Sequence, residues 1–147
     1  MIYLSGVFRA IEAAVPEIQA LFFADDLGML VAANSVTQVS KQLQRAGEAA
    51  IAWGRDNAVQ FDREKTEAVL FTRQRGRLLR EQVERAWVQI EDRMVPFNKE
   101  ATRWLGIWLD TGLSFKAHFQ TRMQKARRAE ARIRSLDRMR GLPLGLV

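Results

Sequence analysis

The segment from Ile18 to Ala33, IQALFFADDLGMLVAA, is apolar almost throughout, yet two adjacent aspartates, Asp25 and Asp26, stand at its centre. A buried carboxylate is costly unless it is paired, hydrogen-bonded or bound to a metal ion, and two neighbouring carboxylates also repel each other. We therefore expect something positive beside the two aspartates. The identity of that positive group is the main functional question.

Two short strands, residues 18–24 and 27–33, are predicted to fold back on each other at Ala24-Asp25-Asp26-Leu27. Aspartate is common in tight turns, so an ordinary acidic turn is one interpretation of the pair. A metal site is the other, because a turn can present both carboxylates at its rim and Mg²⁺ prefers oxygen ligands. The residues alone leave both interpretations open.

The other predicted elements alternate irregularly between helix and strand, which indicates the α+β class. A capping box at Ser35-Val36-Thr37-Gln38 opens a helix that runs to about Asp56. A long basic helix is expected from Phe115 to about residue 139, ended by Gly141 and Pro143. Further predictions are a helix over residues 2–15, strands over 66–72 and 104–109, a loop and short helical turn from 73, and a hairpin with strands over 87–90 and 94–97.

Composition excludes several kinds of site. The chain has no cysteine, which excludes disulfides, thiolate zinc sites and a cysteine nucleophile, and its single histidine, His118, cannot alone form a histidine-rich metal site. Arg9 and Glu12 interrupt the first apolar segment, so no signal peptide is visible. A central aspartate in a membrane span would cost about 2.5–3.5 kcal/mol. We expect a soluble, intracellular protein with no membrane partner, in either nucleus or cytoplasm.

The net charge of +6 is unevenly placed. Nine lysines and arginines but only two acidic residues follow Phe115, so this last segment carries +7. A basic segment beside a nearly neutral body suggests a polyanionic partner, with nucleic acid as the first candidate. A solvated, arginine-rich helix face is the alternative. The residues expected to contact nucleic acid are Arg122, Lys125, Arg127, Arg128, Arg132 and Arg134.

Three blocks, in this order, resemble a known family. Phe23-Ala24-Asp25-Asp26 resembles the aromatic-x-Asp-Asp motif of reverse transcriptases. The stretch WGRDNAVQFDREKTEAVLF, which contains Lys65, is similar to the next block of non-LTR (LINE-type) retrotransposon enzymes, although Asp62 stands where these proteins often have asparagine. Trp104-Leu105-Gly106 is similar to their primer-grip block. The overall pattern is most similar to transposable elements of filamentous fungi.

This resemblance implies a partial polymerase palm over residues 1–112, in which an Asp-Asp hairpin packs with helices beside a small antiparallel sheet. It implies a thumb or connection that begins with the basic helix, over residues 113–147. The activity would be that of an RNA-directed DNA polymerase, a nucleotidyltransferase that adds nucleotides by two-metal phosphoryl transfer. Its partners would be an RNA template/DNA primer duplex and a deoxynucleoside triphosphate.

Individual roles follow from the same resemblance. Asp25 and Asp26 would hold Mg²⁺, with Asp25 the more direct ligand. Phe23 would pack under the turn behind the small Ala24, and Lys65 would lie near the triphosphate. Trp104, Leu105 and Gly106 would press on the primer backbone, where glycine permits close approach.

Two parts of such an enzyme are missing from these residues: a third metal-binding aspartate and a Gly- and Ser-rich nucleotide loop. We therefore expect a truncated domain that is inactive alone, marginally stable, and prone to self-association through an unpaired strand edge. Two alternatives stay open. One is a non-enzymatic module that binds nucleic acid through the basic helix. In that module an apolar seam lets the helix dock on a body while its basic face meets phosphate, and the seam is formed by Met123, Ala126, Ala129, Ile133 and Leu136. The other alternative is a protein whose helix binds a protein partner, with no nucleic acid involved.

Overall fold

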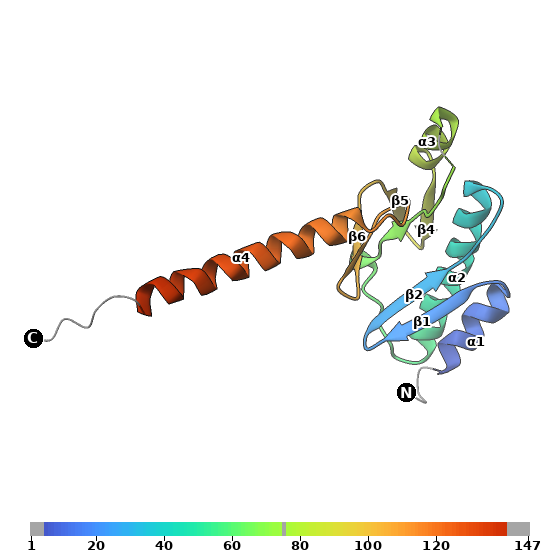
Figure 1. Cartoon of the computed structure of the whole chain (residues 1–147). Helices are drawn as coiled ribbons and strands as arrows, with labels where there is room; N and C mark the ends of the chain where they lie inside the picture. Colours follow the sequence, from blue (N-terminus) through green and yellow to red (C-terminus); the bar gives the residue numbers. More distant parts are fainter. Residues whose placement is uncertain (1–4, 75, 141–147) are drawn as a thin grey trace, which may run out of the picture. The chain divides into compact units, whose positions relative to one another are not determined.

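The computed structural model describes residues 5–74 and 76–140, with side chains through Leu136. It has the expected α+β class, with helices, small sheets and a long last helix (Figure 1). Two compact units, Met1–Lys99 and Glu100–Val147, are each described by themselves. The functional boundary predicted after residue 112 stays a prediction. Residues 2–4 of the first predicted helix and the predicted stop at Gly141 and Pro143 lie outside the described residues.

In the first unit, α1 (Ser5–Ala14) packs against α2 (Val36–Asp56). The two helices approach closely beside Gly6, where an added Cβ would lie 2.5 Å from Trp53 Nε1. Ser35 caps α2 as predicted, because its hydroxyl accepts a hydrogen bond from the Gln38 amide at 3.2 Å. The buried residues of this first core are Val7, Ile11, Val15, Ile18, Ala46 and Ala50.

Strands β1 (Gln19–Phe23) and β2 (Asp26–Leu30) form the predicted antiparallel hairpin, which lies against α1 and α2 (Figure 1). Alternation gives the hairpin two faces. The inner face packs on the first core through Ala20, Phe22, Leu27 and Met29. The outer face, formed by Leu21, Phe23 and Leu30, is 53–60% exposed.

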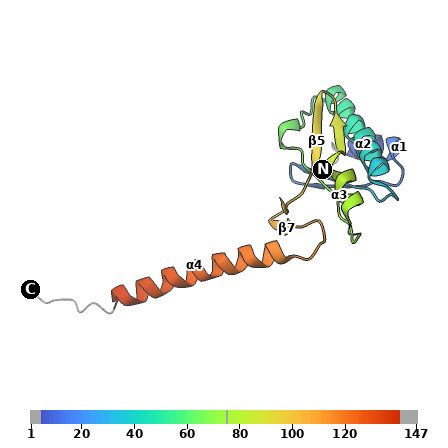
Figure 2. The same cartoon turned by 90° about the horizontal axis from the view of Figure 1, so that it is seen from above.

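A second sheet has the strand order β3-β5-β4. The β4 (Trp87–Ile90) and β5 (Arg93–Asn98) hairpin is confirmed, whereas the strand predicted over residues 66–72 is reduced to β3 (Ala68–Val69), which is parallel to β5. Helix α3 (Arg77–Glu84) precedes β4. Helix α2 lies beside β4 (Figure 2), and the second core between them holds Val36, Val39, Ala68, Val88, Ile90, Val95 and Phe97.

The second unit corrects one prediction. The single strand predicted over residues 104–109 is a hairpin of β6 (Thr102–Trp104) and β7 (Ile107–Leu109). Leu105 and Gly106 form its two-residue turn with φ of 47° and 81°, the pair of positive values that a type I′ turn requires. Leucine is an unusual residue for such a position, so the sequence gives little sign of the turn.

Helix α4 (Lys116–Arg140) follows β7 and matches the predicted long basic helix. The turn predicted at Asp110-Thr111-Gly112 is confirmed, and the Asp110 carboxylate accepts hydrogen bonds from the amides of Gly112 and Ser114. Every residue of α4 from 122 to 136 is exposed, including those of the predicted apolar seam, and docking of this seam stays a prediction. Two apolar side chains of the seam are highly exposed: Ile133 is 66% exposed and Leu136 is 61% exposed.

Candidate functional site

Asp25 and Asp26 lie at the tip of the β1–β2 hairpin, and both are exposed. Pairing of Phe23 with Asp26 leaves Ala24 and Asp25 as the two turn residues. Neither aspartate has a hydrogen-bond or ion-pair partner among the described residues. The fold therefore avoids the cost of burial by placing both carboxylates in solvent, where their oxygens are accessible to a ligand.

The backbone of this turn is strained at Ala24, whose φ is 55°. Asp25 has a negative φ, so only the first turn residue is in the left-handed half of the map, as in a type II′ turn. A residue with a Cβ adopts this conformation at a cost of about 1–2 kcal/mol. Such strain persists where the surrounding structure imposes it and is concentrated at functional sites.

Phe23 differs from its expected position. It was predicted to pack under the turn, but it is 60% exposed on the outer face of the hairpin, opposite Asp26. Alternation along β1 gives the inner position to Phe22 instead. Phe22 packs edge-to-face on Phe8, with ring centroids 5.4 Å apart. The path of the turn is therefore anchored by Phe22.

Lys65 ends a short 3₁₀ helix, η2 (Arg63–Lys65), and its ammonium lies 2.8 Å from an Asp62 carboxylate oxygen. The hydrogen bond that Lys65 donates to Asp62 is the main cause that raises the pKa of Lys65, and the negative charge of Asp25 raises it slightly further. Asp25 is therefore close enough to Lys65 to influence it electrostatically.

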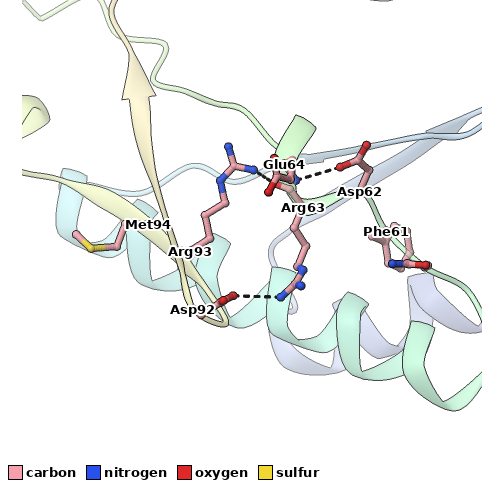
Figure 3. A pocket seen from close by; sticks show the side chains of 8 residues that line it. Phe61, Asp62, Arg63, Glu64, Asp92, Arg93 and Met94 are labelled. Carbon is pink, nitrogen blue, oxygen red and sulfur yellow. Dashed lines mark hydrogen bonds and ion pairs between the residues drawn. The ribbon is translucent and has the colours of Figure 1, made fainter.

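Ion pairs hold η2 against the β4–β5 turn. Arg63 pairs with Glu91 and, at 3.1 Å, with Asp92, while Arg55 of α2 pairs with Glu91 at 2.7 Å. Arg93 donates a hydrogen bond to the Arg63 carbonyl oxygen. Figure 3 shows Arg63 and Asp92 pointing toward each other across this contact. The segment that carries Lys65 is thus held by ion pairs with the β4–β5 turn, and these ion pairs were not predicted from the sequence.

These contacts border an open hollow of about 810 Å³ (Figure 3). Its lining mixes acidic, basic and apolar side chains, and most of its charges already have partners. The lining residues are Gln60, Phe61, Asp62, Arg63, Glu64, Asp92, Arg93 and Met94.

Within the described residues, no group of three or more His, Asp or Glu side chains is arranged to hold a metal ion. The Asp25–Asp26 pair alone offers two unpartnered carboxylates in adjacent positions. This pair suits Mg²⁺, which binds through one or two carboxylates and completes its shell with water or substrate oxygens. Two carboxylates bind more weakly than three, so tight binding is not expected.

In the second unit, the primer-grip-like residues Trp104, Leu105 and Gly106 lie at the tip of the β6–β7 hairpin. Helix α4 is tied to this hairpin at two points. Arg122 donates a hydrogen bond to the Gly106 carbonyl oxygen at 3.3 Å, and the Trp108 amide donates to His118 Nδ1, also at 3.3 Å. His118 therefore has a structural role here.

The predicted nucleic-acid-binding side chains are all exposed along α4. Arg134 forms an ion pair with Glu130 at 2.7 Å, and Arg122 is used at the hairpin as described above. The remaining four have no hydrogen-bond or ion-pair partner in the described part of the chain, and they are Lys125, Arg127, Arg128 and Arg132. These four are available to an anionic ligand.

No described helix combines the length and apolar character needed to cross a membrane. Comparisons of this chain with protein families, with curated proteins and with solved structures find no match.

Proposed function

We propose that residues 1–112 are the second half of a reverse transcriptase palm of the non-LTR type, and that residues 113–147 begin its thumb. One observation carries this proposal: two unpartnered carboxylates stand at a strained turn between apolar strands, with Lys65 within electrostatic range of Asp25. An ordinary two-residue hairpin turn also takes a positive φ at its first residue, but it needs neither two unpartnered carboxylates nor the nearby lysine. The order of the sequence blocks adds to this argument.

The proposed chemistry is RNA-templated DNA synthesis. Mg²⁺, when bound, supplies charge that activates the primer hydroxyl group and stabilises the leaving pyrophosphate. Asp25 and Asp26 hold the ion, Asp25 as the more direct ligand, and Lys65 neutralises charge on the departing phosphates. Trp104, Leu105 and Gly106 position the primer, and the arginines of α4 bind duplex phosphates without sequence preference.

Residues 1–147 by themselves are proposed to bind metal weakly and not to extend a primer. The complete reaction requires a third carboxylate and a nucleotide loop, which these residues do not supply. A primer-extension assay on the purified chain tests this point. Templated DNA synthesis would contradict it.

Metal binding tests the site itself. Asp25→Asn is expected to weaken Mn²⁺ binding at least about tenfold, because one of two adjacent anionic ligands is lost. Asp56→Asn, which removes the same charge from the exposed end of α2, is the matched control. Electron paramagnetic resonance titration of free Mn²⁺ measures both affinities. Equal affinities in the two variants would argue for an ordinary acidic turn.

The second candidate function is a non-enzymatic nucleic-acid-binding module. The exposed, unpartnered Lys125, Arg127, Arg128 and Arg132 favour it. Each phosphate contact contributes about −0.9 to the slope of log affinity against log salt for duplex DNA. Replacing Arg127 and Arg128 by glutamine is therefore expected to reduce the slope by about 1.8. Absence of duplex binding even at low salt would instead favour a helix that docks on a protein partner.

A further inference from the structure

The Asp62 carboxylate uses its two oxygens for different partners. Oδ1 accepts a hydrogen bond from the Glu64 amide at 3.1 Å and so caps η2, whereas Oδ2 lies 2.8 Å from Lys65 Nζ. The two roles are chemically separable. Asparagine has the same shape and keeps an oxygen for the cap, but it offers no charge to the lysine.

Lys65 is the cation that the proposed function assigns to the triphosphate. In the structure its ammonium already pairs with a carboxylate, since Asp62 is its one direct partner among the described residues. A carboxylate at hydrogen-bond distance competes with a phosphate for the ammonium. The neighbouring Arg63 does not replace it, since Arg63 pairs with Glu91 and Asp92.

The pair is open to solvent. The side chain of Lys65 is 85% exposed and that of Asp62 is 49% exposed. A soluble anion can therefore reach the ammonium without any rearrangement of the fold. Exposed ion pairs are weak and screened by salt, so Asp62 acts as a moderate competitor and not as a block.

We propose that Asp62 competes with an incoming deoxynucleoside triphosphate for the Lys65 ammonium, and so lowers the affinity of the site in this chain. This inference rests on the proposed function and adds to it a residue that sets the strength of nucleotide binding. Asp62 is a positioning residue here, since it acts only through Lys65.

The first experiment measures the ion pair without nucleotide. Trace acetic anhydride acetylates neutral amines, and mass spectrometry gives the rate at Lys65. Asp62→Asn is expected to raise this rate about two- to fivefold, because loss of the partner lowers the pKa of Lys65 and frees the ammonium. Glu64→Gln is the matched control: it removes the same charge from a neighbouring exposed side chain that does not pair with Lys65.

The second experiment measures binding of Mg²⁺·dTTP by titration calorimetry at constant ionic strength. Asp62→Asn is expected to bind about two- to fivefold more tightly than the natural chain, and Glu64→Gln about equally. The double variant Asp62→Asn/Lys65→Met should lose the gain, because the competition acts through the lysine.

The outcomes separate the two proposals. If Asp62→Asn binds Mg²⁺·dTTP with the same affinity as the natural chain, the competition alone is overturned. The same holds if Asp62→Asn and Glu64→Gln raise this affinity equally. Faster acetylation in Asp62→Asn without Mg²⁺·dTTP binding in any variant establishes the ion pair but overturns the competition. It does not contradict the proposed function, which already assigns these residues no nucleotide loop. Equal acetylation rates of Lys65 in Asp62→Asn and in the natural chain would show that the ion pair does not affect Lys65, and this would overturn the competition.

Discussion

At the scale of single residues, Ala24 and Ala58 adopt the same unusual backbone conformation, with positive φ of 55° and 54°. Glycine adopts this region without the steric cost that a Cβ imposes, although it loses more entropy on folding. We expect Ala24→Gly and Ala58→Gly each to raise the free energy of unfolding by about 0.5–1 kcal/mol. Urea unfolding measures this change.

The two alanines are expected to differ in their effect on metal binding. Only Ala24 adjoins the carboxylate pair, so only Ala24→Gly is expected to weaken Mn²⁺ binding as the turn loses rigidity. Ala58→Gly is thus the control for stability without function. If both variants bound Mn²⁺ as the natural chain does, strain at Ala24 would have no part in the site.

The residues of the site were predictable to different degrees. Asp25, Asp26 and Lys65 were selected from the sequence, because adjacent aspartates in an apolar segment and the order of the blocks are local signals. No role could be predicted for Asp62, since only the folded backbone turns its carboxylate toward Lys65. The exposure of Phe23 was not foreseen, because strand alternation can place either Phe22 or Phe23 inside until the register is known.

At the scale of elements, Asp110 links β7 to α4. Its carboxylate accepts hydrogen bonds from the Ser114 amide at 3.0 Å, the Ser114 hydroxyl at 3.0 Å and the Gly112 amide at 3.1 Å. These bonds favour the charged form, chiefly through the Ser114 amide, and they hold the pKa of Asp110 below its usual value of 3.8. The resulting stabilisation is present above about pH 4 and is lost as the pH falls through the lowered pKa.

Asp110→Asn is therefore expected to destabilise the second unit at pH 7, and the difference from the natural chain should shrink below pH 4. Circular dichroism of thermal unfolding at pH 7, 5 and 3 measures this dependence. Glu100→Gln is the control, because Glu100 is an exposed acid of the same unit with no hydrogen-bond partner in the described residues. A difference that stayed constant with pH would exclude a charge-dependent role for Asp110.

Elements were predicted well where the signal is local. The cap at Ser35, the end of α2 and the β1–β2 and β4–β5 hairpins follow from side-chain periodicity and turn residues. The β6–β7 turn was missed because Leu105 carries no turn signal. Strand β3 proved short because its length depends on pairing with β5, a contact distant in sequence.

At the scale of the whole molecule, the β1–β2 hairpin is paired with no other described strand, and its outer face is apolar. Unpaired edges and exposed apolar faces favour association between chains. We expect the natural chain to self-associate in sedimentation equilibrium and Leu21→Lys to weaken this association. Leu78→Lys, on the exposed face of α3, is the matched control. Equal association of both variants would exclude the hairpin as the contact.

The ion pairs that join Arg55, Arg63 and Glu91 connect three elements and could not be predicted from local patterns. The α+β class and the basic character of α4 could be predicted from the sequence, because they depend on periodicity and composition. The residues of the predicted apolar seam of α4 are exposed, and sequence alone does not say whether another surface covers them.

The most direct test of the central claim locates a metal ion by Mn²⁺-induced line broadening in the ¹H–¹⁵N spectrum. If Asp25 and Asp26 hold the ion, substoichiometric Mn²⁺ first broadens the amides of residues 24–27 and then that of Lys65, and Asp25→Asn removes both effects. Broadening centred on other acidic residues such as Glu91 and Asp92, or spread evenly over the chain, would contradict it.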